Sequence, residues 1–197
     1  MTGVTTESTP LPRWLAPRLP IDGWQTNQQT VDAVGVGVAV PDHWAPQPDT
    51  SMPGTVVWHG VFPGEGLAIA RRDGVDPDDD LATWIIADVA LTSGCHPALL
   101  PDGATAEPRS WFADDDDPTV DEHLDVDESR GATGLVAIVG QRTEMVRGYV
   151  VVVRRDTTAW KVTLQVSSAC LVGTDDDLVD SNDHVRARAV LGDLAFI

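Results

Sequence analysis

A strict alternation of apolar and polar side chains constrains the fold of this chain more than any other feature. Over residues 158–167, Trp160, Val162, Leu164 and Val166 alternate with Lys161, Thr163, Gln165 and Ser167. Because successive side chains of a strand point to opposite faces, the pattern predicts a strand of an antiparallel sheet with one buried face and one face in water. We interpret the polar face, with Lys161, Thr163 and Gln165, as an open surface that could bind a partner.

Further strands and two helices are expected around this segment. Apolar or alternating stretches predict strands at 34–40, 55–62, 67–71, 134–140 and 144–154, and a shorter one near 109–112. One helix is expected after Pro77, where acidic residues can cap free amides, with an apolar stripe of Leu81, Trp84, Ile85 and Val89. A second is expected at 183–191. Together these segments predict an α+β domain, with a curved antiparallel sheet of about six strands and two main helices, the first covering one sheet face.

The chain is expected to hold one domain, preceded by an extension. Residues 1–30 contain Pro10, Pro12, Pro17 and Pro20, a composition typical of extended chain, and residues 31–197 suffice for one α+β domain with its own core. The first residues lack the basic and apolar regions of a secretory signal, so a cytoplasmic location is expected. No apolar run is long enough for a membrane-spanning helix, so membrane insertion is not expected.

The charge balance bears on the choice of partner. Lys and Arg total 13 against 31 for Asp and Glu, which gives a formal net charge of -18. Such a surface repels phosphate backbones and anionic lipid head groups, so nucleic acid is not an expected partner. A protein partner is expected to carry a basic surface.

The two cysteines, Cys95 and Cys170, give no sign of a disulfide scaffold or a zinc site, and we predict two free thiols. Cys95 and His96 are neighbours in the sequence, but neighbouring side chains do not generally face one another, and no G-x-S-x-G elbow occurs. We therefore predict no catalytic residue and no cofactor.

An acidic loop at residues 114–127 offers the main alternative. Asp121, His123, Asp125 and Asp127 could bring several ligand atoms to a divalent cation. The spacing does not fit an EF-hand. In a 12-residue calcium loop that starts at Asp125, Arg130 stands at the sixth position, which needs glycine, and Val136 at the twelfth, which needs glutamate. A solvated acidic loop is the favoured interpretation, and a metal-dependent enzyme or divalent-cation binder is the alternative.

Seven tryptophans are unusual for a chain of this length. Trp58, Trp84 and Trp160 fall at core positions of the expected elements. Trp44 and Trp111 fall in expected loops or short strands, where an aromatic ring can anchor a partner or pack over a sheet edge. Both stay candidate partner-binding residues.

Several short stretches carry a resemblance to a known fold. They are a strand that runs into a Pro-x-x-Trp turn at 38–44, the strand at 67–71 before the acid-started helix, the late meander, and the closing segment at 190–196. The order resembles the Mog1/PsbP-like fold and, within it, the bacterial families of LpqN and DcrB type. The chain departs from the lipoprotein pattern in lacking a cysteine near its start. The resemblance implies a non-catalytic binding or accessory module, and protein binding is the function that we predict.

Overall fold

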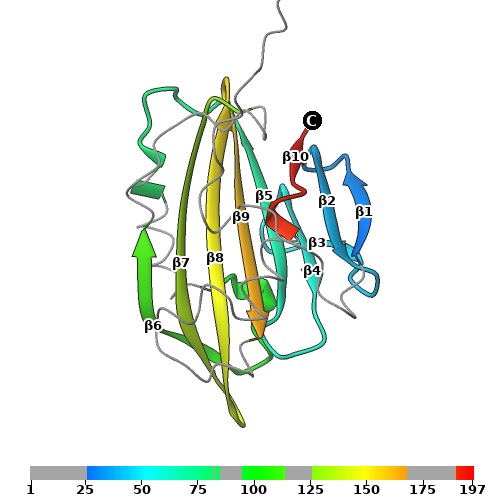
Figure 1. Cartoon of the computed structure of the whole chain (residues 1–197), viewed down its shortest axis with the longest axis vertical. Helices are drawn as coiled ribbons and strands as arrows, with labels where there is room; N and C mark the ends of the chain where they lie inside the picture. Colours follow the sequence, from blue (N-terminus) through cyan, green and yellow to red (C-terminus); the bar gives the residue numbers. More distant parts are fainter. Residues whose placement is uncertain (1–25, 82, 85–94, 114–125, 168–189) are drawn as a thin grey trace, which may run out of the picture.

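The computed structural model describes residues 26–81, 83–84, 95–113, 126–167 and 190–197. In these residues the strands form two antiparallel sheets (Figure 1). The small sheet has the order β1-β2-β10, and the large sheet has the order β3-β4-β5-β9-β8-β7-β6. The long strands β7, β8 and β9 run side by side through the large sheet, and the small sheet lies to one side of them in this view.

Ten strands and one short 3₁₀ turn make up the described secondary structure outside residues 81–84 and 190–191. The small sheet contains β1 (Thr26–Val31), β2 (Val36–Pro41) and β10 (Ala195–Phe196). The large sheet contains β3 (Pro46–Pro48), β4 (Thr55–His59), β5 (Gly66–Asp73), β6 (Thr105–Ala113), β7 (Glu128–Val139), β8 (Thr143–Arg155) and β9 (Thr158–Ser167). A short 3₁₀ turn, η1 (Pro97–Leu99), precedes β6.

The predicted α+β class with one sheet and two main helices is wrong. The described chain is nearly all strand, it forms two sheets, and no helix in it reaches seven residues. Much of each expected helix, including Ile85, Val89 and residues 183–189, lies outside the described residues. Val36, Val38 and Val40 form one apolar face of β2, and all three are fully buried. A strand buries a whole face in this way when it packs against another sheet, so β2 belongs to a second sheet rather than to the edge of the first.

The main core lies between the two sheets. The valines of β2 pack with apolar residues of β4, β5, β8 and β9, among them Trp58 and Trp160. Both indoles also donate hydrogen bonds across the core: Trp160 Nε1 donates to the carbonyl of Val34, in the turn between β1 and β2, at 2.6 Å, and Trp58 Nε1 donates to Gln29 Oε1 of β1 at 3.0 Å. The core positions predicted for these two tryptophans are confirmed.

The opposite face of the large sheet is covered as well. Leu81 is buried there and Trp84 half-buried, against Ala132, Val150 and Val152. The expectation that Thr163 and Gln165 face water is therefore wrong, since their side chains are 2% and 0% exposed. Lys161 is half-buried. An alternating strand shows which residues share a face, but not whether a later or earlier segment covers that face.

The described chain begins within the expected extension. Residues 26–30 belong to β1 and pair with β2, whereas residues 1–25 lie outside the described residues. The division into an extension and one domain otherwise stays a prediction. Within the described residues, no helix combines the length and the apolar character needed to cross a bilayer.

Candidate functional site

The connection between β4 and β5, residues 60–65, is a tightly closed loop, which we call the β4–β5 loop. Gly60 N–H donates to the Glu65 carbonyl at 2.8 Å, and Glu65 N–H donates to the Phe62 carbonyl at 2.9 Å. Gly64 has a φ of 76°, in the left-handed region that favours glycine. The backbone of the loop is therefore held by its own hydrogen bonds.

The Glu65 side chain folds back under the tip of this loop. One carboxylate oxygen, Oε2, accepts hydrogen bonds from the amides of Val61 at 3.1 Å and Phe62 at 3.4 Å. The residue is 4% exposed, and within the described part of the chain its other oxygen, Oε1, has no hydrogen-bond partner. A Cβ at Gly60 would lie 2.5 Å from Glu65 Cγ, so glycine there makes room for this carboxylate.

The tip of the loop presents two neighbouring apolar side chains to solvent. Val61 is 69% exposed and Phe62 is 50% exposed. Among the described residues, the other large exposed apolar side chains are Met52 and Ile197, which stand singly. Among the residues that the structure describes, the β4–β5 loop is thus the place where two large apolar side chains are both adjacent and exposed.

An open cavity of about 310 Å³ lies beside the loop. Its lining consists of the loop, His59 and three residues in and after η1: His59, Gly60, Val61, Phe62, Pro63, Gly64, Glu65, Leu99, Leu100 and Pro101. The η1 turn comes close to the sheet at Gly66, where a Cβ would lie 2.6 Å from Leu99 Cδ2 and 2.3 Å from the Trp58 carbonyl oxygen. Glycine at this position therefore lets η1 form one wall of the cavity.

Gln165 holds the loop and the segment before η1 together from below. Its Nε2 donates to the Gly64 carbonyl at 2.6 Å and to Cys95 Sγ at 2.7 Å, and its Oε1 accepts from the His96 amide at 2.8 Å. All of these groups are buried. Gln165 therefore supports the site from within the molecule rather than from its surface.

The Cys95 thiol is buried in the same place. Burial raises its pKa to about 12, although the hydrogen bond from Gln165 acts in the opposite direction. His96 caps η1, since its Nδ1 accepts from the Ala98 amide at 3.3 Å. A thiol with so high a pKa is protonated at neutral pH and is a poor nucleophile, which favours a structural role for this pair. Cys95 is a free thiol, but Cys170 lies outside the described residues, so the redox state of the pair stays a prediction.

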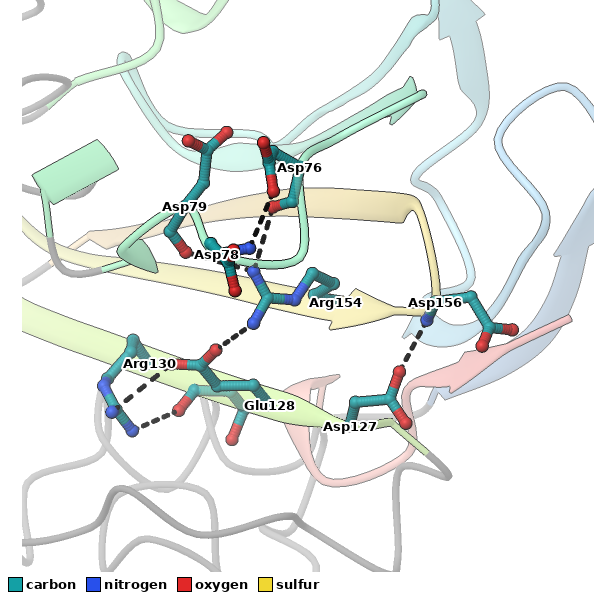
Figure 2. Close-up of polar contacts among 9 residues, drawn as sticks. Asp76, Asp78, Asp79, Asp127, Glu128, Arg130, Arg154 and Asp156 are labelled. Carbon is teal, nitrogen blue, oxygen red and sulfur yellow. Dashed lines mark hydrogen bonds and ion pairs between the residues drawn. The ribbon is translucent and has the colours of Figure 1, made fainter.

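An acidic region at one end of the large sheet is organised by Arg154 of β8 (Figure 2). Its guanidinium donates to the carbonyls of Asp79 at 3.0 Å and Asp76 at 3.3 Å, and to Glu128 Oε2 at 2.6 Å. Arg130 forms a second ion pair with Glu128 at 3.3 Å. The guanidinium thus fastens the segment after β5 to β7 and β8.

Of the four predicted metal ligands, the structure describes Asp127. Asp127 Oδ2 accepts from the Asp156 amide at 2.5 Å, which fixes the turn between β8 and β9, where Asp156 has a φ of 53°. Asp121, His123 and Asp125 lie outside the described residues. Across the residues that the structure does describe, no group of three or more His, Cys, Asp or Glu side chains could hold a metal ion.

The five predicted partner-binding residues do not form one exposed patch. Trp44 is 1% exposed and belongs to the main core, as do its neighbours on β2. Trp111 lies in β6 opposite Gly134, but its side chain is not among those described. With Thr163 and Gln165 buried, Lys161 is the one of the five with a described, partly exposed side chain. Their role in binding stays a prediction.

The residues of the β4–β5 loop were not predicted as a site. The sequence places Val61 and Phe62 at the end of a strand and Glu65 in a hairpin connection. A signal was present, because two consecutive apolar residues, Val61 and Phe62, stand between Gly60 and Pro63, where a turn rather than a strand is expected. A glutamate between two glycines is a second sign, since glycines permit close approach of a side chain.

Comparisons with known proteins identify the fold. The chain has a Mog1/PsbP-like fold. The Ran-binding protein Mog1p of Saccharomyces cerevisiae matches with a TM-score of 0.50 at 13% identity, over 88% of this chain and 96% of that one. The cyanobacterial PsbP of Synechocystis sp. PCC 6803 matches with a TM-score of 0.49 at 15% identity, over 93% of this chain and 99% of that one.

The likeness to Mog1p shows the fold and nothing narrower. A mutant of Mog1 matches with a TM-score of 0.43 at 15% identity, over 84% of this chain and 87% of that one. No protein-family model and no curated protein matches the chain. The narrower resemblance to the LpqN and DcrB type families is not shown by these comparisons.

Proposed function

We propose that this protein is a non-catalytic module that binds another protein through the β4–β5 loop. The observation that carries the proposal is the pair of exposed apolar side chains, Val61 and Phe62, on a loop held by hydrogen bonds to the Glu65 carboxylate. Adjacent exposed apolar residues beside a cavity are typical of interaction sites, and an aromatic residue often contributes much of the binding free energy.

The rigidity of the loop supports the same function. Binding is weakened by the entropy lost when a mobile segment becomes ordered, so a loop that is already ordered binds more tightly with the same contacts. Glu65 fixes the amides of Val61 and Phe62, and Gln165 fixes the Gly64 carbonyl. The loop is therefore prepared for binding before a partner arrives.

We further propose that the partner presents a basic surface. The formal net charge of -18 attracts such a surface over long range and increases the association rate at low ionic strength. The description of Mog1p as a Ran-binding protein is compatible with a protein partner for a chain of this fold. No observation in the described residues favours the alternative of a metal-dependent enzyme, and we do not propose it.

Affinity capture from the native host tests the proposal. The protein and a Val61→Ser, Phe62→Ser double variant are immobilised, and captured proteins are compared by quantitative mass spectrometry. Ile197→Ser is the matched control, because Ile197 is 64% exposed and directly follows β10, outside the loop. We expect at least one protein to be lost from the double variant and retained by the control, and to bind the purified protein in calorimetry more weakly as salt is added. Equal capture by all three proteins contradicts the proposal.

A further inference from the structure

We propose that the cavity beside the β4–β5 loop receives a cationic side chain, arginine or lysine, of the protein partner, and that Glu65 binds its head group. This inference rests on the proposed function, because it names the chemistry of one contact that the loop makes. It concerns a different part of the site, since Val61 and Phe62 lie at the tip and Glu65 lies beneath them.

The Glu65 carboxylate is only partly satisfied. Oε2 accepts two backbone amides of the loop, whereas within the described residues Oε1 has no hydrogen-bond partner, although the residue is 4% exposed. A buried carboxylate oxygen without a donor is unfavourable, because it has lost water and gained no replacement. A positively charged N–H donor would satisfy this oxygen with a charge-assisted hydrogen bond.

The walls of the cavity suit the stem of such a side chain. Leu99, Leu100 and Pro101 on the η1 side offer apolar contacts to the stem, although polar groups make up more of the exposed lining than apolar ones. Arginine and lysine pack their methylene groups along apolar surfaces and extend their charge to a polar site. The volume of about 310 Å³ is at the low end of ligand pockets, which suits one long side chain better than a large cofactor.

The charge of the whole molecule favours the same occupant. At a formal net charge of -18, an anionic side chain would be repelled on approach and a cationic one attracted. His59, the other titratable residue of the lining, is exposed to solvent. Glu65 is therefore the buried charged group that a ligand in the cavity would meet.

Nuclear magnetic resonance titrations of the full chain test the inference with four probes of known structure. The probes are the N-acetyl, N-methylamide derivatives of arginine, lysine, citrulline and norleucine, at constant ionic strength. Citrulline has nearly the shape of arginine without its charge, and norleucine has an apolar stem alone. We expect arginine or lysine to shift resonances of residues 59–65 and 99–101, with binding at least about tenfold tighter than citrulline. The comparison of arginine with lysine identifies the preferred head group.

Two matched substitutions locate the charge that is responsible. Glu65→Gln keeps an oxygen that can accept from the loop amides and replaces the second oxygen with an amide donor, so binding of the cationic probe should weaken at least about tenfold. Glu107→Gln makes the same chemical change at an exposed position of β6 and should leave probe binding unchanged. If Glu65→Gln does not fold, the comparison of arginine with citrulline on the unsubstituted protein still decides.

The possible outcomes separate this inference from the proposed function. Equal binding of arginine and citrulline, or an equal loss with Glu107→Gln, overturns the inference. If the Val61, Phe62 double variant loses its partner while the cationic probes fail to bind at the loop, the proposed function stands without it. If the probes bind as expected but the double variant keeps every captured protein, the proposed binding through the loop tip is wrong and the cation site remains.

Discussion

Replacing Gln165 with methionine should lower the free energy of unfolding by about 2–4 kcal/mol. Methionine keeps the length and much of the volume of glutamine, but it makes none of the three hydrogen bonds to Gly64, Cys95 and His96. Each buried polar group left without its partner costs about 1–3 kcal/mol, and two of the three are backbone groups. The substitution also removes the amide of Gln165, which no longer has to be kept out of water, and this recovers part of the cost. The expected net loss is therefore smaller than the sum for the three unpaired groups.

Urea unfolding followed by tryptophan fluorescence measures this effect, since the chain has seven tryptophans. The matched control is Gln28→Met, the same chemical change on an exposed position of β1, which should alter stability by no more than about 0.5 kcal/mol. If the unfolding free energy falls with urea concentration at a similar slope in both variants, the compactness of the unfolded state has not changed. If Gln165→Met is as stable as Gln28→Met, then Gln165 does not hold the loop and the reasoning is refuted.

Three other changes test separate parts of the structure. Gly60→Ala should destabilise the protein by about 1–3 kcal/mol in thermal melts, because the new Cβ would lie 2.5 Å from Glu65 Cγ, whereas Gly140→Ala, with its nearest neighbour at 3.5 Å, should be nearly neutral. Arg154→Met should cost about 1–3 kcal/mol in urea unfolding, because it removes charge-assisted bonds to Glu128 and to two carbonyls, while Arg109→Met, in an exposed pair, should cost less than about 1 kcal/mol. Because folding raises the pKa of the Cys95 thiol from 9.0 to about 12, its contribution to stability is complete below about pH 9 and is lost as the pH rises toward 12. Cys95→Ala should flatten this alkaline loss in melts at graded pH, and an identical pH profile in both proteins would contradict the assignment.

Most strands of the large sheet could be predicted, although β3 was missed, and the reason for the success is visible in β9. Its alternation from residue 158 to 167 matches the observed strand, and the apolar run at 150–153 lies in the neighbouring β8. Such patterns are local, so a single strand reveals them without knowledge of its neighbours. The same locality explains the error at Gln165, because the alternation cannot show that η1 and the segment before it cover that face.

A cue for this burial existed across the sheet rather than along the strand. Gln165 lies between Gly66 of β5 and Gly148 of β8 in the register of the large sheet. Two glycines beside one polar residue leave a hollow in the sheet, and a hollow can admit another backbone. The register that aligns these residues is set by long-range pairing, so the cue becomes readable only once the fold is known.

Of the small sheet, β2 was predicted by the strand expected at 34–40, whereas its two edge strands were not, for a related reason. Its edge strands are the polar β1 and the two-residue β10, and neither has the apolar alternation that marks a strand. β1 and β10 form strands because they pair with β2. The backbone groups of β2 need hydrogen-bond partners, since its core side is buried. At the candidate site, likewise, the sequence showed a turn but not that Glu65 would fold beneath it.

The position of β10 has a consequence for the order of synthesis. β2 leaves the ribosome early, but the strand that pairs with one of its edges, β10, is made only after all of the large sheet. Until then, a strand of valines has an unpaired edge, which is the kind of edge that invites pairing with other chains. The Arg155 guanidinium, which donates to the Phe196 carbonyl at 2.9 Å, then holds the late strand in place. A nascent chain that stalls before residue 195 would therefore expose this edge for as long as it waits.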